Sequence, residues 1–210
     1  MAEPELEQKY VLADDRPWAL LEPELFAALK AQGCGAEYRG QAVQTDTYYD
    51  TPDDAVLRAD SALRVRQTEQ GCRLTWKTPA PAQGAAFARN EEEVCLASPQ
   101  DRDALLDTYR AQLPGAGALP LAPVLVVENL RKTYAVTCGG ETYELALDTV
   151  RYRTMGGQRD YRERQLELER KTGAGAALPR LAAALETACP WLVPADGSKY
   201  RRARKFLAGV

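Results

Sequence analysis

Charged residues near the N-terminus alternate in a way that could support metal and phosphate chemistry. Glu5, Glu7 and Lys9 in the segment ELEQK lie two positions apart. On a β-strand, this spacing directs all three side chains to the same face. Carboxylates bind hard divalent cations through oxygen, and an ammonium group binds phosphate. An ordinary solvated strand surface gives the same pattern, so its meaning depends on the other segments.

The same separation of charged from apolar positions recurs along the chain. In LRVR (63–66), Arg64 and Arg66 alternate with Leu63 and Val65. A surface that serves only solubility mixes both signs, because like charges at neighbouring positions repel. Here each segment concentrates one sign, which favours a binding surface. The further charged residues at such alternating positions are Arg73, Lys77, Arg89, Glu91, Glu93, Glu144, Asp148, Glu167 and Glu169.

These residues lie on segments whose period of two predicts β-strands. Glycines at 71, 139–140 and 156–157 predict tight turns between consecutive strands. The expected strands are 3–11, 43–50, 61–68, 72–79, 87–96, 123–138, 141–154 and 161–171. The helices expected between them are 16–33, 99–113 and 177–189, with a short one after Ser198. The pattern therefore predicts about eight strands in a mostly antiparallel meander.

The helices decide which strand face we expect inside. Their apolar stripes need a partner surface, and the apolar strand faces supply one. If eight strands close into a barrel with helices packed outside, the charged faces line the lumen, which is about wide enough for one small ligand. We therefore predict an α+β fold, with a single domain over residues 1–210 and a closed eight-stranded antiparallel β-barrel. The alternatives are a sheet with its charges in solvent and a lipocalin-like barrel with an apolar lumen.

Composition narrows the classes of function. The chain has 210 residues, 45% hydrophobic and 27% charged, with a net charge of −3, which predicts a soluble domain without a nucleic-acid or membrane partner. No apolar segment suits a membrane span or a signal peptide, so we expect a cytoplasmic protein. The absence of histidine excludes a Ser-His-Asp triad and His-ligated zinc. Five scattered cysteines predict five reduced thiols.

The ordered set of charged motifs resembles the CYTH superfamily of triphosphate tunnel metalloenzymes, and in particular bacterial inorganic triphosphatases. The resemblance covers nearly the whole chain. It implies a barrel that forms a tunnel around a triphosphate and Mg²⁺ or Mn²⁺. The motifs that carry it are ELEQK (5–9), TDTYYDTP (45–52), LRVR (63–66), LTWK (74–77), RNEEE (89–93), LALD (145–148), ELE (167–169) and SKYRRA (198–203).

The resemblance also assigns roles to individual residues. It implies that Glu5, Glu7, Asp148, Glu167 and Glu169 bind metal, and that Glu5, Glu7 and Lys9 are catalytic. The residues implied in triphosphate binding are Lys9, Arg64, Arg66, Lys77, Arg131 and Lys199. Arg73, Arg89, Glu91 and Glu93 are expected to be supporting tunnel charges. The chain departs from some members at Asn129, where they carry a base two residues before Arg131.

The expected function is metal-dependent hydrolysis of inorganic triphosphate to pyrophosphate and phosphate. The alternatives are a thiamine or other organic triphosphatase, a class IV adenylate cyclase and a non-catalytic polyphosphate-binding module. The expected partner is a small-molecule substrate, and the expected state is a monomer or homodimer. Tyr48, Tyr49 and Trp76 are expected to pack beneath helices rather than to contact substrate.

Overall fold

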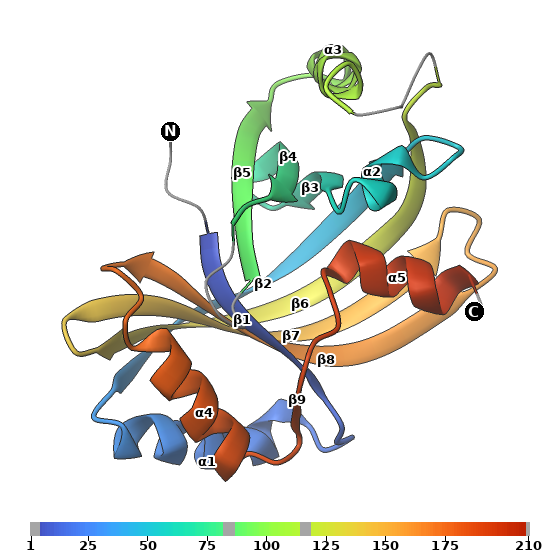
Figure 1. Cartoon of the computed structure of the whole chain (residues 1–210). Helices are drawn as coiled ribbons and strands as arrows, with labels where there is room; N and C mark the ends of the chain where they lie inside the picture. Colours follow the sequence, from blue (N-terminus) through green and yellow to red (C-terminus); the bar gives the residue numbers. More distant parts are fainter. Residues whose placement is uncertain (1–4, 82–86, 114–118, 209–210) are drawn as a thin grey trace.

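The computed structural model describes residues 5–81, 87–113 and 119–208. The strands are β1 (Glu5–Leu12), β2 (Gly35–Asp50), β3 (Ala62–Thr68), β4 (Gly71–Pro79), β5 (Phe87–Leu96), β6 (Ala122–Cys138), β7 (Glu141–Thr154), β8 (Asp160–Thr172) and β9 (Leu192–Pro194). The helices are α1 (Trp18–Ala31), α2 (Ala55–Arg58), α3 (Pro99–Arg110), α4 (Leu178–Ala188) and α5 (Lys199–Ala208). Figure 1 shows their arrangement. Within the described part of the chain, no helix is both long and apolar enough to cross a membrane.

Eight of the strands close into an antiparallel barrel. Their order around the barrel is β5-β4-β3-β2-β6-β7-β8-β1, and β1 pairs again with β5. This closing contact places Glu5 opposite Arg89 and Glu7 opposite Phe87. The short strand β9 adds to β1 through Tyr10–Leu12. The α+β fold with a closed eight-stranded antiparallel barrel, predicted from the alternating segments, is confirmed.

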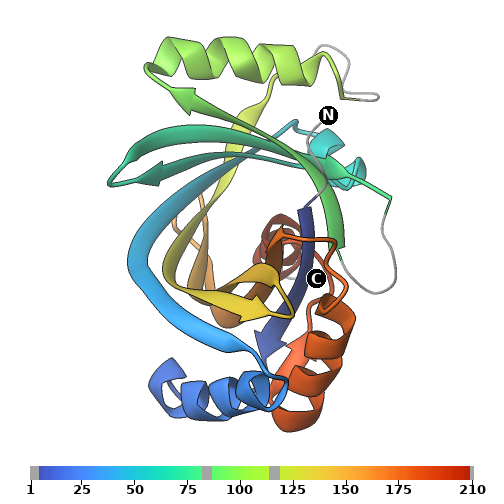
Figure 2. The ribbon, with the colours of Figure 1, turned by 90° about the vertical axis from the view of Figure 1, so that its left-hand side faces the viewer.

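The apolar strand faces lie outward beneath helices. Leu145, Leu147, Leu166 and Leu168 are fully buried in one cluster, together with apolar residues of α1 and α4. These two helices lie side by side against one side of the barrel (Figures 1 and 2). A second cluster includes Trp76 of β4, whose ring stacks on Tyr109 near the end of α3 at 4.9 Å between centroids. Burial of this apolar surface drives folding and leaves the charged faces turned inward.

Helix α5 packs differently from α1, α3 and α4. At one end of the barrel, the inward positions of β6 and β7 change from charged to apolar, with Val127, Val150 and Tyr152 almost fully buried. Tyr200 and Leu207 of α5 belong to the same core cluster as these residues. Because α5 packs on inward-facing residues, it closes this end of the barrel and brings its first residues toward the lumen.

Three elements differ from the sequence-based expectations. Strand β2 begins at Gly35 rather than at 43, because its first half pairs with β6 through a bulge between Tyr38 and Gly40. Helix α2 was not expected; the Asp50 carboxylate accepts hydrogen bonds from the backbone N–H groups of Val56 and Leu57 there. Strand β9 was not expected. The expected strand 3–11 begins at residues outside the described ones.

The cysteine prediction is wrong for one pair. Cys34 and Cys138 form a disulfide across 104 positions of sequence, with their Cα atoms 4.5 Å apart. Strand register explains the pairing: Gly35 lies opposite Thr137, so the residues flanking this pair come together at the end of β2 and β6. Cys72, Cys95 and Cys189 are free thiols. Spacing along the chain gives no sign of such a contact.

Candidate active site

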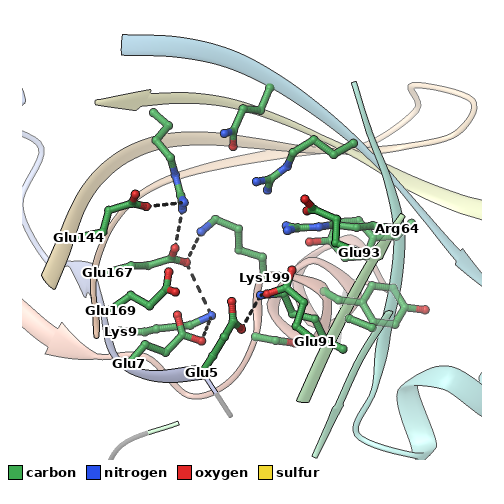
Figure 3. A pocket seen from close by; sticks show the side chains of 18 of the residues that line it. Glu5, Glu7, Lys9, Arg64, Glu91, Glu93, Glu144, Glu167, Glu169 and Lys199 are labelled. Atoms are coloured by element: carbon green, nitrogen blue, oxygen red, sulfur yellow. Dashed lines mark hydrogen bonds and ion pairs between the residues drawn. The ribbon is translucent and has the colours of Figure 1, made fainter. Parts of the chain in front are cut away.

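The barrel encloses one large charged cavity of about 590 Å³. Figure 3 shows acids and bases from strands on all sides pointing into a common space. Charged side chains dominate its wall, as expected if the ionic strand faces look inward. The charged residues that line it are Glu5, Glu7, Lys9, Arg64, Arg66, Lys77, Glu91, Glu93, Arg131, Glu144, Glu167, Glu169, Lys171 and Lys199.

Carboxylates form a row across three adjacent strands on one wall. Glu169 of β8 lies directly opposite Glu7 of β1 on one side and Glu144 of β7 on the other. Like charges at directly opposite positions destabilise a sheet unless a counter-charge neutralises them. Burial raises the pKa of Glu169, and the nearby charges of Glu5 and Glu7 raise it further.

Glu5 extends this acidic wall toward β5, the strand with which β1 pairs. Burial and a hydrogen bond with the Glu91 carboxyl group raise the pKa of Glu5. The Lys77 ammonium group lies between these two acids, 2.7 Å from Glu5 Oε2 and 3.0 Å from Glu91 Oε2. Lys77 therefore compensates part of the negative charge where β1 meets β5.

The oxygen-rich, crowded donor set fits a hard divalent cation such as Mg²⁺ or Mn²⁺. A cation there would relieve the repulsion that raises the pKa of Glu169. In the described residues, no three carboxylate, thiolate or imidazole groups already surround one metal position. Metal binding would therefore require acids such as Glu7 to exchange their present ion pairs for the cation; Glu7 Oε1 lies 2.9 Å from Lys9 Nζ.

A basic wall lies on β3, where two arginines share one acid. Arg66 donates from Nε and Nη2 to the two carboxylate oxygens of Asp46 at 2.7 and 2.8 Å. Arg64 donates from Nη1 to Asp46 Oδ2 at 3.0 Å. Both guanidinium groups line the cavity, whereas Asp46 is only 1% exposed. Two neighbouring guanidinium groups held in fixed orientations can donate several hydrogen bonds to one phosphate group.

A second group of bases surrounds Glu167 and Asp148. Arg131 donates to both oxygens of Asp148 at 2.8 and 2.7 Å and also to Glu167. Lys199 Nζ lies 2.9 Å from Asp148 Oδ2 and hydrogen-bonds to Glu167. Burial raises the pKa of Glu167, but Lys199, Lys9 and Arg131 outweigh it and hold this pKa well below its usual value. Asp148 is fully buried and does not line the cavity; it supports Arg131 and Lys199 from behind.

Two of the expected supporting charges lie outside the cavity wall. Arg73 pairs with Glu93 at 2.8 Å, and both side chains are largely exposed. Arg89 binds Asp60, with Nη1 and Oδ2 3.0 Å apart. Neither arginine lines the cavity, whereas Glu91 and Glu93 do.

The family of this domain follows from its similarity to known proteins. The CYTH domain profile matches residues 19–203. The chain belongs to the CYTH family. Among solved structures, HpAC1 of Hippeastrum, described with a dominant triphosphatase activity, aligns with a TM-score of 0.62 at 18% identity, over 96% of this chain and 95% of its own. PH1819 of Pyrococcus horikoshii OT3 gives 0.55 at 22% identity, over 97% of each chain.

A candidate adenylate cyclase of Bacillus halodurans also shares the fold, with a TM-score of 0.58 at 20% identity over 95% of this chain and 97% of its own. At such identities these likenesses show the fold alone. They agree with the closed barrel of this CYTH domain but do not indicate its substrate. The substrate has to be inferred from the residues that line the cavity.

Sequence reasoning missed several residues in or directly behind the wall of the CYTH cavity. Asp46, the partner of both β3 arginines, was not proposed, although it alternates with Gln44 and Tyr48 on the strand expected at 43–50. Tyr48 stacks on Tyr200 of α5 at 5.1 Å between centroids, so it packs on a helix as expected, and it also lines the cavity. Lys171 alternates with Glu169, to which it is paired at 2.7 Å. In each case, alternation on a charged strand was the available signal.

Proposed function

We propose that this CYTH domain hydrolyses inorganic triphosphate to pyrophosphate and phosphate in the barrel cavity, with Mg²⁺ or Mn²⁺ as cofactor. The observation that carries the proposal is the opposition of two walls: carboxylates on β1, β7 and β8 face arginines of β3 across one cavity. A metal–polyphosphate complex carries charges that match both walls. The triphosphatase activity described for HpAC1 also supports a triphosphatase function.

The acidic wall would hold the cofactor. Glu5, Glu7, Glu167 and Glu169 line the cavity and offer carboxylate oxygens to a divalent ion. A bound Mg²⁺ or Mn²⁺ supplies charge neutralisation at phosphoryl oxygens and a water of lowered pKa. We propose a ligand role for Asp148 only through rearrangement, because both of its oxygens now accept hydrogen bonds or ion pairs from Arg131 and Lys199.

The bases would bind the phosphate chain and stabilise the charge that develops during phosphoryl transfer, which depends mainly on positioning and electrostatics. Arg64, Arg66 and Lys77 serve this purpose on β3 and β4, and Arg131 and Lys199 on the opposite side. Burial lowers the pKa of Lys9, but Glu7 and Glu167 outweigh it, so the net shift is upward. Lys9 is therefore a cation that binds phosphate or orients the attacking water through a hydrogen bond, rather than a base that removes its proton.

An organic triphosphate is the competing substrate. The cavity of about 590 Å³ leaves room beyond a triphosphate chain, and Tyr48 and Tyr200 place aromatic surface in its wall. The same arrangement of charges could therefore also serve hydrolysis of thiamine triphosphate or cyclisation of ATP. A further alternative is a protein that binds polyphosphate without hydrolysing it.

A phosphate-release assay separates these functions. Tripolyphosphate, thiamine triphosphate and ATP are each supplied with Mg²⁺, Mn²⁺ or EDTA, and cyclic AMP is measured alongside ATP. We expect the fastest release from tripolyphosphate, with activity lost in EDTA and restored by excess metal. Faster turnover of either organic substrate, cyclic AMP formation or tight tripolyphosphate binding without phosphate release would each overturn the proposal in favour of the matching alternative.

A further inference from the structure

Asp46 is an acid built into the basic wall of the cavity. It lies on β2, its register partner on β3 is Arg66, and Arg64 lies two residues along the same strand. Its carboxylate is 1% exposed and accepts three hydrogen bonds from these two arginines. Arg64 and Arg66 are therefore not independent side chains, because one buried anion holds both.

The surroundings of Asp46 distinguish it from the acids of the opposite wall. Both of its oxygens are occupied by guanidinium groups, and Lys199 adds a third nearby positive charge. Burial raises the pKa of Asp46, but Arg64 and Arg66 outweigh it and hold this pKa at about 2. The carboxylate thus stays ionised, with its lone pairs directed at arginines rather than at a cation.

The hydrogen bonds to Asp46 do not use every donor of the two arginines. Arg66 uses Nε and Nη2 on Asp46, which leaves Nη1. Arg64 uses Nη1 on Asp46, and its Nε is buried without a hydrogen-bond partner among the described residues. A free arginine loses much rotamer entropy when it grips an anion, and prior fixation removes that cost from the binding step.

We propose that Asp46 is a positioning residue that fixes Arg64 and Arg66 in the orientation in which they grip one phosphate group of the substrate. The inference rests on the proposed function and assigns to that site a residue outside its metal and phosphate ligands. Asp46 itself touches neither substrate nor metal; it acts through the two arginines.

The first test is the isosteric variant Asp46→Asn. We expect the dissociation constant for tripolyphosphate, measured by calorimetry in EDTA to prevent turnover, to rise about tenfold, since the charge-assisted hydrogen bonds that fix both arginines are weakened. In the metal-loaded enzyme, KM should rise by more than kcat falls.

Glu22→Gln is the matched control. Glu22 of α1 is a partly buried acid that accepts hydrogen bonds from Lys132 Nζ and from the Tyr134 hydroxyl, but it does not line the cavity. Both variants should lower the melting temperature, and only Asp46→Asn should weaken tripolyphosphate binding. Equal losses of affinity in the two variants would show a merely structural effect and overturn the inference.

A double-mutant cycle tests whether Asp46 acts through its partner. Arg66→Gln should weaken binding by itself, and adding Asp46→Asn to it should cost clearly less than Asp46→Asn costs in the wild type. Full additivity would contradict the inference. If the wild type releases no phosphate from tripolyphosphate with Mg²⁺ or Mn²⁺, the proposed function fails; if it does release phosphate and Asp46→Asn binds tripolyphosphate as tightly as the wild type, the inference alone fails.

A measurement on the wild-type protein tests the inference even if the variant does not fold. The arginine Nε–H groups of Arg64 and Arg66, assigned by nuclear magnetic resonance, should already be as rigid without tripolyphosphate as with it. Nε–H groups that are mobile in the free protein and become ordered only with tripolyphosphate would overturn the inference.

Discussion

At the scale of single residues, the candidate site is a set of paired charges, and the proposed substrate and metal would have to replace partners that these residues already have. Lys77 joins Glu5 to Glu91, Lys9 lies beside Glu7, and Arg131 binds Glu167. A buried charge is costly without a partner, so these pairs offset the cost of burying the charges of the cavity wall. The same pairs can open toward a ligand that carries both signs, because a metal–triphosphate complex offers each residue a replacement partner.

Glu7→Gln should abolish metal-dependent hydrolysis while leaving the fold intact. Glu7 is 4% exposed, lines the cavity and lies opposite Glu169, so the variant removes the negative charge of one proposed metal ligand and changes little volume. We expect kcat on tripolyphosphate to fall by at least about a hundredfold, the loss typical of one charge-stabilising group.

Steady-state kinetics and circular dichroism measure this outcome. The control is Glu37→Gln on β2, which removes an exposed acid paired with Arg39. Wild-type turnover by the Glu7 variant at saturating metal would remove Glu7 from the mechanism.

Asp46 should make stability depend on pH in the acid range. Its pKa in the fold is about 2, below the ordinary 3.8, so its stabilising contribution is present above pH 3.8 and lost as pH falls through 2. The shift corresponds to about 2 kcal/mol at neutral pH, with roughly half lost by pH 3.

Urea denaturation of wild type and Asp46→Asn between pH 6 and pH 3 isolates this contribution, since other acids titrate in both proteins. The difference in unfolding free energy should shrink as pH falls. A difference that stays constant or widens would contradict the assigned pKa.

At the scale of elements, the barrel strands supply charges and α5 sets where the cavity ends. Val127 and Val150 turn the inward face apolar at one end, and α5 covers it with Tyr200 and Leu207. The same packing delivers Lys199, the first residue of α5, to Asp148 and Glu167. The helix therefore couples closure of the barrel to completion of the site.

Tyr200→Phe should weaken this coupling. The Tyr200 hydroxyl donates to Asp50, the buried acid that also binds the first turn of α2. Loss of a buried hydrogen bond to a charged group costs about 1–3 kcal/mol. We expect that loss in urea denaturation, together with a several-fold rise in KM for tripolyphosphate as Lys199 becomes less ordered.

Tyr38→Phe is the control, because the Tyr38 ring is 54% exposed. If the Tyr200 variant is destabilised but its KM is unchanged, the packing of α5 does not affect substrate binding.

At the scale of the whole molecule, closure depends on contacts between distant segments. Among the described residues, β1 meets β5 through three residue pairs, whereas β2 and β6 pair along nearly their full lengths. The Cys34–Cys138 disulfide lies at the end of that long ladder, on the side of the core under α1 and α4. It ties the start of β2 to the end of β6 and lies apart from the charged cavity wall.

Removing this disulfide should lower stability without changing catalysis. Cross-linking residues this far apart constrains the unfolded chain, which typically contributes about 2–4 kcal/mol. We expect Cys34→Ser, or reduction of the wild type, to lower the melting temperature measured by calorimetry, with kcat on tripolyphosphate unchanged.

Cys95→Ser, at an exposed thiol, provides the comparison. Equal melting temperatures for reduced wild type, oxidised wild type and Cys34→Ser would show that the disulfide contributes nothing to stability.

The sequence by itself determined the eight barrel strands, apart from the first half of β2, and the inward direction of most of their charges. Alternation with period two is local, and the helices' need for an apolar partner surface assigns the leucine faces outward; Leu145, Leu166 and Glu169 lie as expected. Whether the cavity residues perform the roles implied by the family resemblance stays a prediction.

Only the tertiary structure decided which charges meet. Asp46 meets Arg66 across 20 positions, and Cys34 meets Cys138 across 104, because strand register sets these contacts. The insertion of α5 and the burial of Asp148 behind Arg131 likewise depend on packing between segments far apart in the chain. A local pattern gives the face of a side chain, but its partner depends on the pairing of whole strands, which no single segment encodes.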